Sequence, residues 1–368
     1  MAVAVAAMGA LTFSVDGIEA ELGVTRVEGH EALSQPYTFY IDAASADRDL
    51  DLSTALGAFG RLVIRNDDDS VERLIHGIVC DATYAAYHRR HTVYRFAVVP
   101  RLWFLSQRVD SRIFQNQSLG EIVSQVLGDA GFASDEYELA LNHHYPKHEF
   151  RVQYRESDLQ FIQRLMEEEG VYYFFRHSEE QHTLIVTDNP LSHDDIAEPA
   201  TIPFHDETGL VAESETVSRF VYTERARSDA VTLNDYNFKK PALDLRSSRE
   251  SSAGRGLSVY DHPAGFNEPE RGDHLASVRL QALQATHRQA EGFSDCRRFN
   301  PGFQFSLTDH PHEPLNRDYL LTAITHHAEQ PQVLAEDAAD QPGRYQNEFH
   351  CIPADHPYWT EYADEGSR

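Results

Sequence analysis

The hydrophobic pattern between residues 154 and 175 predicts a helix followed directly by a strand. Ser157 is a favourable N-cap, and Gln160 completes a capping box in which each side chain satisfies a backbone donor. Gly170 supplies a left-handed stop. The β-branched and aromatic residues 171–175 then predict a strand. One helix face is buried, because apolar residues recur there at three- and four-residue spacing: Leu159, Ile162, Leu165 and Met166.

The first hundred residues alternate between apolar and polar positions with a period of two, the pattern of half-buried strands. Short strands separated by polar turns predict a small antiparallel β-barrel, which we assign to residues 8–105. An α/β insert then spans residues 106–200, with a second capping box at Ser118 and Glu121 and a hairpin closed by residues 182–187. The expected strands of the barrel are residues 11–15, 37–41, 62–65, 74–87 and 94–99, with turns at 66–69 and 88–91.

The last part of the chain returns to strand patterns, and we assign residues 201–358 to a second β-barrel. Residues 247–270 are rich in Gly, Ser and Pro and predict a long loop, whereas residues 272–291 are mostly helix-like. Residues 359–368 are expected to form a tail. The strands expected here are residues 220–222, 230–233 and 303–307.

An internal repeat relates the two predicted barrels. Three landmarks of the first barrel recur in the same order in the second, so we expect two copies of one barrel that flank the insert. Chance similarity between strand-like sequences is the alternative. The matched segments are residues 60–67 with 302–309, 78–84 with 323–328, and 95–100 with 348–353.

The segment ESDLQFIQRLMEEEGVYYFF, residues 156–175, resembles the signature of the VgrG spike proteins of type VI secretion systems, which are similar to contractile phage baseplate hub proteins. The similarity runs from about residue 11 to 358 and ends with Phe349-x-Cys-Ile-Pro-Ala354. The resemblance implies a mainly β protein with two related tube-like barrels per subunit, assembled as a homotrimeric, pseudo-six-fold ring. A phage tail hub is the alternative within the same class.

The resemblance also implies partners. The ring would dock on a hexameric tube protein, contact baseplate proteins, and carry effectors or a spike-tip protein through a C-terminal part. A full VgrG continues into a further barrel and a β-helical needle where this chain stops at Arg368. We therefore expect either an N-terminal fragment or a short natural form, and we assign no piercing activity to these residues.

Composition limits the other function classes. A length of 368 residues suggests two or three domains. The net charge of −27 disfavours binding to nucleic acid and to anionic membranes. No apolar run reaches the ~20 residues that a membrane span needs, and the N-terminus lacks the basic region of a signal peptide. If the protein leaves the cell, a route other than general secretion is therefore expected. The resemblance implies synthesis in the cytoplasm and export by type VI secretion to the extracellular space or a target cell.

Lysine is scarce in this acidic chain, occurring only at positions 147, 239 and 240. Many acids with few lysines fit adaptation to a salt-rich cytoplasm, in which ions screen the self-repulsion. An acidic lineage without halophily explains the composition equally well, and the sequence leaves both open.

The sequence predicts no catalytic, cofactor-binding or metal-binding residues and no cofactor. The common nucleophile, phosphate-loop and metalloprotease motifs are absent. Cys80, Cys296 and Cys351 are expected to be reduced thiols. The histidines are expected mainly at the surface rather than in a metal site. Those weighed as metal ligands are His76 with Cys80 at strand spacing, His143 with His144, His310 with His312, and His326 with His327.

The three glutamates at positions 167–169 crowd a helix C-terminus, where the helix dipole disfavours anions by a few tenths of a kcal/mol each. One explanation is a carboxylate pair for glycoside hydrolysis, which would make the chain a carbohydrate-active hydrolase. The alternatives that we favour are a solvated helix end, or an arginine partner across a domain or subunit boundary.

Overall fold

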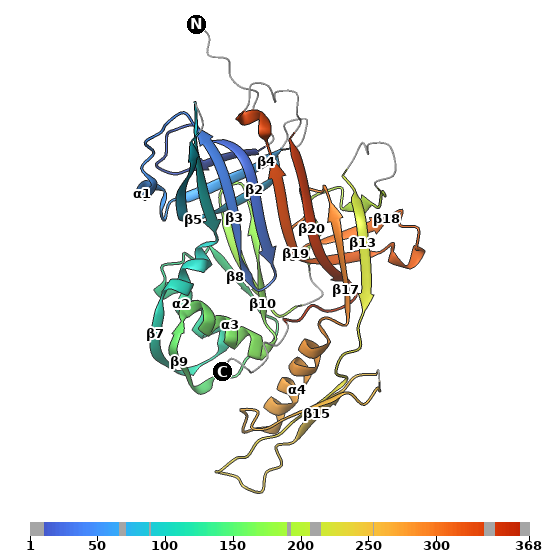
Figure 1. The fold of residues 1–368 in the computed structure, drawn as a ribbon. Coiled ribbons are helices and arrows are strands. Elements are labelled where there is room, and N and C mark those ends of the chain that lie inside the picture. Colours follow the sequence, from blue (N-terminus) through green and yellow to red (C-terminus); the bar gives the residue numbers. More distant parts are fainter. Residues whose placement is uncertain are drawn as a thin grey trace.

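The computed structural model describes residues 11–65, 71–87, 90–189, 193–206, 215–252, 254–334 and 343–360. Strands dominate it, and one twelve-stranded sheet forms the upper body in Figure 1, with α2, α3, α4 and smaller sheets below it. The predicted turn at 66–69, residues 88 and 89 of the other turn and residues 361–368 of the tail lie outside the described residues. None of the helices described is both long and apolar enough to cross a membrane.

The first half of the sheet contains six strands in the order β1-β4-β5-β6-β3-β2. The predicted alternation is confirmed, since Tyr37, Phe39 and Ile41 are buried on one face of β3. A short helix, α1 (Leu52–Ala55), connects β3 to β4. The strands are β1 (Leu11–Val15), β2 (Gly23–Ala32), β3 (Gln35–Ser45), β4 (Phe59–Arg65), β5 (Val71–Tyr87) and β6 (Thr92–Val99).

The second half repeats this arrangement, in the order β12-β18-β19-β20-β17-β13. Each strand takes the place of the strand of the same rank in the first half. The duplication predicted from the sequence is therefore present as a duplicated strand order. The strands are β12 (Thr201–Pro203), β13 (Val217–Glu224), β17 (Arg288–Ser294), β18 (Gln304–Thr308), β19 (Asp318–Glu329) and β20 (Arg344–Pro353), with short 3-10 turns at Glu313–Leu315 (η2) and Pro331–Val333 (η3).

The strand pairing fixes the register of the repeat. When Phe96 is matched with Phe349, as the third landmark predicts, the register shifts at Cys80 in β5 and at Thr322 in β19 fall at equivalent positions. The other two landmarks were wrong in register. Ile78 pairs with Val99 and Leu320 with Ile352, so residue 78 matches residue 320 rather than 323. Phe59 pairs with Ile78 and Gln304 with Leu320, so residue 60 matches residue 305 rather than 302. Strand periodicity alone does not determine this offset between the two aligned halves.

The insert lies below the first half and contains two capped helices, as predicted. The α3 helix (Asp158–Glu169) has the Ser157–Gln160 capping box and ends at Gly170 with φ 75°, and α2 (Leu119–Asp129) has the Ser118–Glu121 box. The strands form a three-stranded sheet, β10-β11-β8, and a two-stranded ribbon, β7·β9. The remaining elements are η1 (Arg101–Gln107), β7 (Val109–Gln117), β8 (Tyr137–Ala140), β9 (His148–Ser157), β10 (Tyr172–His177) and β11 (His182–Thr187).

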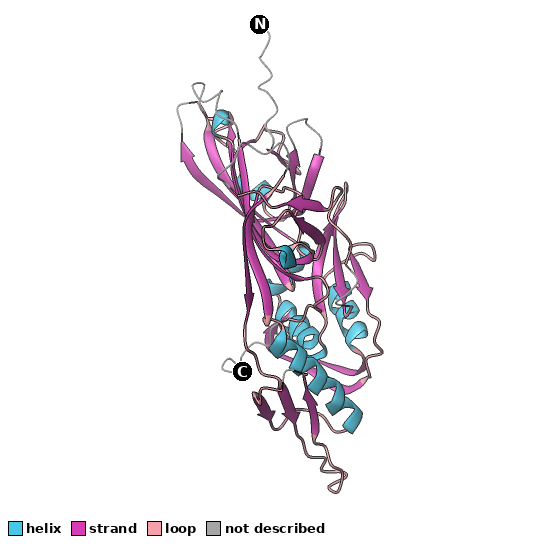
Figure 2. Ribbon diagram, turned by 90° about the vertical axis from the view of Figure 1, so that its right-hand side faces the viewer, coloured by secondary structure: helices cyan, strands magenta, loops and turns pink. Residues whose placement is uncertain are grey.

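A separate arm, residues 225–287, emerges between β13 and β17 and projects away from the sheet (Figures 1 and 2). The predicted loop at 247–270 is wrong in part, because β15 (Ser247–Glu250) and β16 (Ser258–Asp261) pair on either side of β14 (Ala230–Leu233). This pairing supplies hydrogen bonds that local composition does not reveal. The α4 helix (Pro269–Gln284) packs on this sheet and ends before β17 begins, so the predicted helix to residue 291 was too long.

Candidate assembly interface

The two halves of the sheet join where β2 pairs antiparallel with β19, from Ala32–Ala323 to Arg26–Glu329. A buried ionic cluster, formed by Glu31, Arg73 and His326, fixes this joint. Arg73 contacts Glu31 and donates to the carbonyl oxygen of Phe299 at 2.6 Å, while His326 Nε2 lies 2.8 Å from Glu31 Oε1. Buried charged side chains therefore link three strands, β2, β5 and β19.

Electrostatics in this cluster favour the charged carboxylate. Burial alone would raise the pKa of Glu31, but the Arg73 guanidinium and the bond to His326 outweigh it and lower the pKa to about 2. Burial lowers the pKa of His326. His326 is 1% exposed whereas His327 is exposed, so the two neighbours point to opposite faces as predicted. The expectation of surface histidines was wrong for His326, because this strand lies inside the joint between the halves.

In both halves the two terminal strands are brought close together. The side chain of Gln330 links β1 to β2: its Oε1 accepts from Leu11 N at 3.1 Å, and its Nε2 donates to Leu11 O and Val24 O at 3.2 and 2.9 Å. In the second half, a parallel bridge between Phe204 and Val217 connects the end of β12 to β13. In each half the sheet therefore curves so that its two outermost strands approach each other.

Two strand edges are left without a strand partner in the part of the chain that the structure describes. Beyond Ile78, β5 is paired only on the side of β6, and from Arg219 to Glu224, β13 is paired only on the side of β17. Tyr84 and Tyr87 on β5 are about half exposed. An unpaired strand edge presents backbone donors and acceptors to any strand that approaches it.

The β7·β9 ribbon presents a second unusual surface. Its outer face consists mostly of uncharged side chains, although a quarter of the chain is charged and the Arg155 guanidinium lies over the Tyr154 ring. Five large apolar side chains on this face are 41–67% exposed. Contiguous apolar patches of this kind mark interaction surfaces more often than free surfaces. The exposed apolar residues are Val109, Ile113, Phe150, Val152 and Tyr154.

Two of the three glutamates at the end of α3, Glu168 and Glu169, bind arginines. Glu168 pairs with Arg151 at 2.9 Å and, more weakly, with Arg164. Glu169 is 4% exposed and binds Arg271 of α4 through both oxygens, at 2.5 Å each. The predicted arginine partner across a domain boundary is confirmed for Glu169.

His274, also on α4, lies 3.2 Å from the Glu169 carboxylate. Burial alone would raise the pKa of Glu169, but hydrogen bonds from His148, His274 and Arg271 outweigh it and hold the pKa far below its usual value. Glu169 is therefore a permanent anion that ties the arm to the insert.

The strand after this helix holds the end of the described chain. Tyr172 packs edge-on against Tyr358 at 5.0 Å between ring centroids, and a Cβ on Gly170 would lie 2.9 Å from the ring of Trp359. No local pattern predicts this contact, because the contacting residues are almost two hundred positions apart.

The other candidate residues do not assemble into a site. His143 and Tyr145 both contact Asp188, a buried acceptor that also binds the backbone N–H of Asn142. The backbone N–H of His312 donates to the ring of its neighbour His310, in a turn. Across the described ranges, no group of three or more His, Cys, Asp or Glu side chains is placed to hold a metal ion.

The placement of His76 and Cys80 on one strand face stays a prediction. The register of β5 shifts at Cys80, so the regular alternation that starts before His76 ends there. His76 is buried, and its Nε2 contacts the carbonyl oxygen of Ser178 at 3.0 Å. Burial lowers the pKa of His76 and raises the pKa of the Cys80 thiol.

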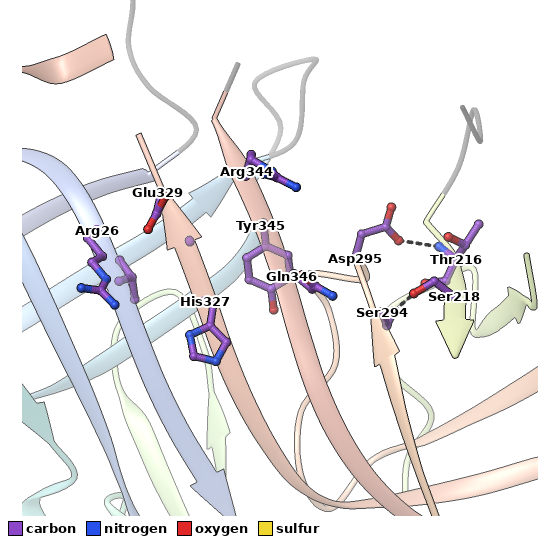
Figure 3. Close-up of a pocket in the computed structure, with 12 residues that line it drawn as sticks. Arg26, Thr216, Ser218, Ser294, Asp295, His327, Glu329, Arg344, Tyr345 and Gln346 are labelled. Atoms are coloured by element: carbon purple, nitrogen blue, oxygen red, sulfur yellow. Dashed lines mark hydrogen bonds between the residues drawn. The ribbon is translucent and has the colours of Figure 1, made fainter. Parts of the chain in front are cut away.

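A hollow of about 400 Å³ lies over the polar face of β2, β19 and β20 near the joint (Figure 3). Arg26, His327 and Tyr345 line it from these strands, and Asp295 accepts from the backbone N–H of Thr216 across its far side. The side chains come from five strands or their ends and do not converge on one point. The hollow is therefore a surface of the sheet rather than a catalytic cleft.

The comparisons with known proteins agree with this geometry. A family described as phage tail baseplate hub (GPD) matches residues 30–332. The chain is 34% identical over 342 residues to the type VI secretion system spike protein VgrG4b of Pseudomonas aeruginosa. The alignment covers 92% of this chain and 42% of that protein. It is 33% identical to the spike protein VgrG3 of Vibrio cholerae, covering 94% and 35%. The chain thus spans less than half the length of these relatives.

Solved structures share the fold at low sequence identity. The c3393 protein of E. coli, described as a component of the type VI secretion system with structural similarity to the T4 tail proteins gp27 and gp5, has a TM-score of 0.69 at 18% identity, covering 96% of this chain and 79% of that one. A 43 kDa prophage tail protein of Shewanella oneidensis has a TM-score of 0.63 at 14% identity, covering 94% and 99%.

Proposed function

The chain belongs to the phage tail baseplate hub family, and from that premise we propose that it forms the base of a type VI secretion spike. In this role three copies form a ring in which each chain contributes two equivalent halves. The ring docks on a hexameric tube protein, contacts the baseplate, and supports the spike and its effectors. The duplicated strand order carries the proposal, because one chain with two equivalent halves converts three-fold into pseudo-six-fold symmetry.

The surfaces of the chain support assembly. Among the described residues, one unpaired edge belongs to β13, the last strand in the sheet order, and the other to the part of β5 beyond Ile78, where β4 ends. The ribbon adds an exposed, mostly apolar face. Stable assemblies bury large, well-packed surfaces. Export follows from the same assignment: the ring leaves the cell with the spike. The Francisella PdpA–VgrG complex, a structural relative, shows another protein bound to a VgrG.

A tail hub of a contractile phage is the second candidate, and the structural likeness to a prophage tail protein favours it equally. A carbohydrate hydrolase is the weaker alternative. It needs one carboxylic acid with a raised pKa beside an ionised carboxylate. Glu169 and Asp188 instead have lowered pKa values, because arginine, histidine and backbone donors hold them as anions.

Sedimentation velocity of the 368-residue chain tests the assignment. We expect a species of about 125 kDa, three times the 41.7 kDa chain, with three-fold or pseudo-six-fold ring projections in negative-stain electron microscopy. Co-sedimentation with the tube protein encoded beside it would separate the spike from the phage hub. A monomer at every concentration would show that these residues do not hold the ring together.

A further inference from the structure

We propose that the free edge of β5 pairs antiparallel with the free edge of β13 from a second copy of this chain, with Thr83 opposite Thr223 and Tyr84 opposite Tyr222. This inference rests on the proposed ring and specifies the contact that closes it. The comparisons show a shared fold but not which strands of this chain meet, or in which register.

The first step is the joint already present within the chain. The edge of β19 is divided between two partners: its start, Asp318–Leu320, pairs with β18, and its end, Ala323–Glu329, pairs with β2. The strand of equal rank in the first half, β5, is divided in the same way. Its start pairs with β4 up to Ile78, but the remaining edge has no strand partner in the described residues.

The second step is the same comparison for the partner strand. The start of β2 is held near β1 by Gln330, and its remainder pairs with β19. The equivalent strand, β13, is linked at Val217 to the end of β12, and within the described ranges its remainder lacks the partner that β2 has. One chain thus contains one completed joint and the two unmatched sides of an equivalent joint. A second copy supplies the missing side to each.

The third step fixes the register. Phe96 pairs with Ala82, and its equivalent Phe349 pairs with Ile324, so Thr83 corresponds to Thr325. On their other sides, Phe96 pairs with Ile41 and Phe349 with Gly292, so Ile41 corresponds to Gly292. Ile41 pairs with Val27 and Gly292 pairs with Phe220, so Val27 corresponds to Phe220.

His30 therefore corresponds to Thr223. Within the chain, Thr325 pairs with His30 and His326 pairs with Gly29. The same register places Thr83 opposite Thr223, and Tyr84 opposite Tyr222.

The paired side chains suit each other. Thr–Thr and aromatic–aromatic pairs are among the favourable cross-strand pairs, at roughly 0.2–1 kcal/mol each. Tyr84 is 51% exposed in the single chain, and pairing would cover part of it. The joint also removes two exposed edges, which would otherwise template unspecific association.

Disulfide trapping tests the register. In a Cys80→Ser background, one variant carries Thr83→Cys with Thr223→Cys and another carries Tyr84→Cys with Tyr222→Cys. Adjacent cross-strand pairs alternate in spacing, so one of the two variants has the closer geometry. The matched control combines Thr83→Cys with Arg219→Cys, which places the sulfurs four residues, or roughly 13 Å, out of register.

We expect at least about fivefold more disulfide-linked oligomer on oxidation in one matched variant than in the control, because disulfides require Cα atoms within about 7 Å. Single-cysteine variants should give none through these positions. Equal or greater linkage in the control, or none in either matched variant of a chain that sediments as a trimer, would overturn the joint and leave the ring intact. A chain that stays monomeric would overturn both.

A charge exchange provides a second readout that does not depend on oxidation. Thr83→Asp combined with Thr223→Asp should weaken association, whereas Thr83→Asp with Thr223→Lys should restore it. The difference should be roughly fivefold or less per joint, since directly opposed charges on strands contribute up to about 1 kcal/mol. No difference between these two variants in an associating chain would contradict the proposed register.

Discussion

Two nitrogens of Arg271 donate to the two carboxylate oxygens of Glu169, each at 2.5 Å, although the two residues are 102 positions apart. The side chains are 14% and 3% exposed, so both charges are largely withdrawn from water. Bidentate arginine–carboxylate pairs combine charge with fixed geometry. This pair anchors α4, and with it the arm, to the end of α3.

Glu169→Gln should lower the free energy of unfolding by about 2–4 kcal/mol, because it leaves Arg271 buried without its counter-charge. Arg271→Gln should cost a similar amount. The double variant should cost less than the sum of the two single changes, since it removes both charges together. Urea unfolding measures all three, with the exposed Glu21→Gln as a control that should stay within about 0.5 kcal/mol. Strict additivity would show that the two groups are not coupled.

The contrast between Ser157 and Glu169 shows how far sequence reasoning reached. The capping box, the buried stripe and the Gly170 stop were all predictable, because each depends on residues within four positions. The partner of Glu169 was predicted as to type but not as to identity, since only the tertiary fold brings α4 to α3. The strands β15 and β16 and the burial of His326 were missed for the same reason: partners distant in sequence create them.

Acid should weaken the joint between the halves through Glu31. Its pKa is about 2 in the folded chain, against an ordinary value of 4.5. A lowered carboxyl pKa contributes stability above the unfolded pKa, and that contribution is lost as the pH falls from about 5 towards 2. The loss for this group is up to about 3 kcal/mol.

Comparison with Glu31→Gln isolates this effect. The variant should be less stable than the parent at pH 7, since Arg73 then lacks its counter-charge, and the gap should narrow as the pH falls. Urea titrations at pH 7, 5 and 3 measure the gap. A gap that is constant over this range would contradict the assigned role of Glu31.

Gly170→Ala should destabilise the chain more than an alanine at another left-handed glycine. At Gly170 the backbone has φ 75° and a Cβ would lie 2.9 Å from Trp359, whereas Gly57 has φ 80° with no atom within 4 Å. Gly57→Ala therefore reports backbone strain alone, about 1 kcal/mol. Gly170→Ala should cost more and should shift the fluorescence of Trp359, observed in a Trp103→Phe background. If both variants lose the same free energy of unfolding and the emission spectrum is unchanged, the contact with Trp359 does not contribute to stability.

Gln330→Ala should release the first strand of the sheet. The side-chain amide of Gln330 forms hydrogen bonds with the backbone N–H and carbonyl of Leu11 and with the carbonyl of Val24. All of these groups are buried. Its removal leaves buried polar groups without partners, at about 1–3 kcal/mol of unfolding free energy. Because the bonds tie β1 to β2, hydrogen exchange should accelerate at residues 11–15 and stay unchanged in α3. Gln35→Ala, at the exposed first residue of β3, is the matched control. Uniformly faster exchange in all elements would indicate a general loss of stability rather than the opening of this closure.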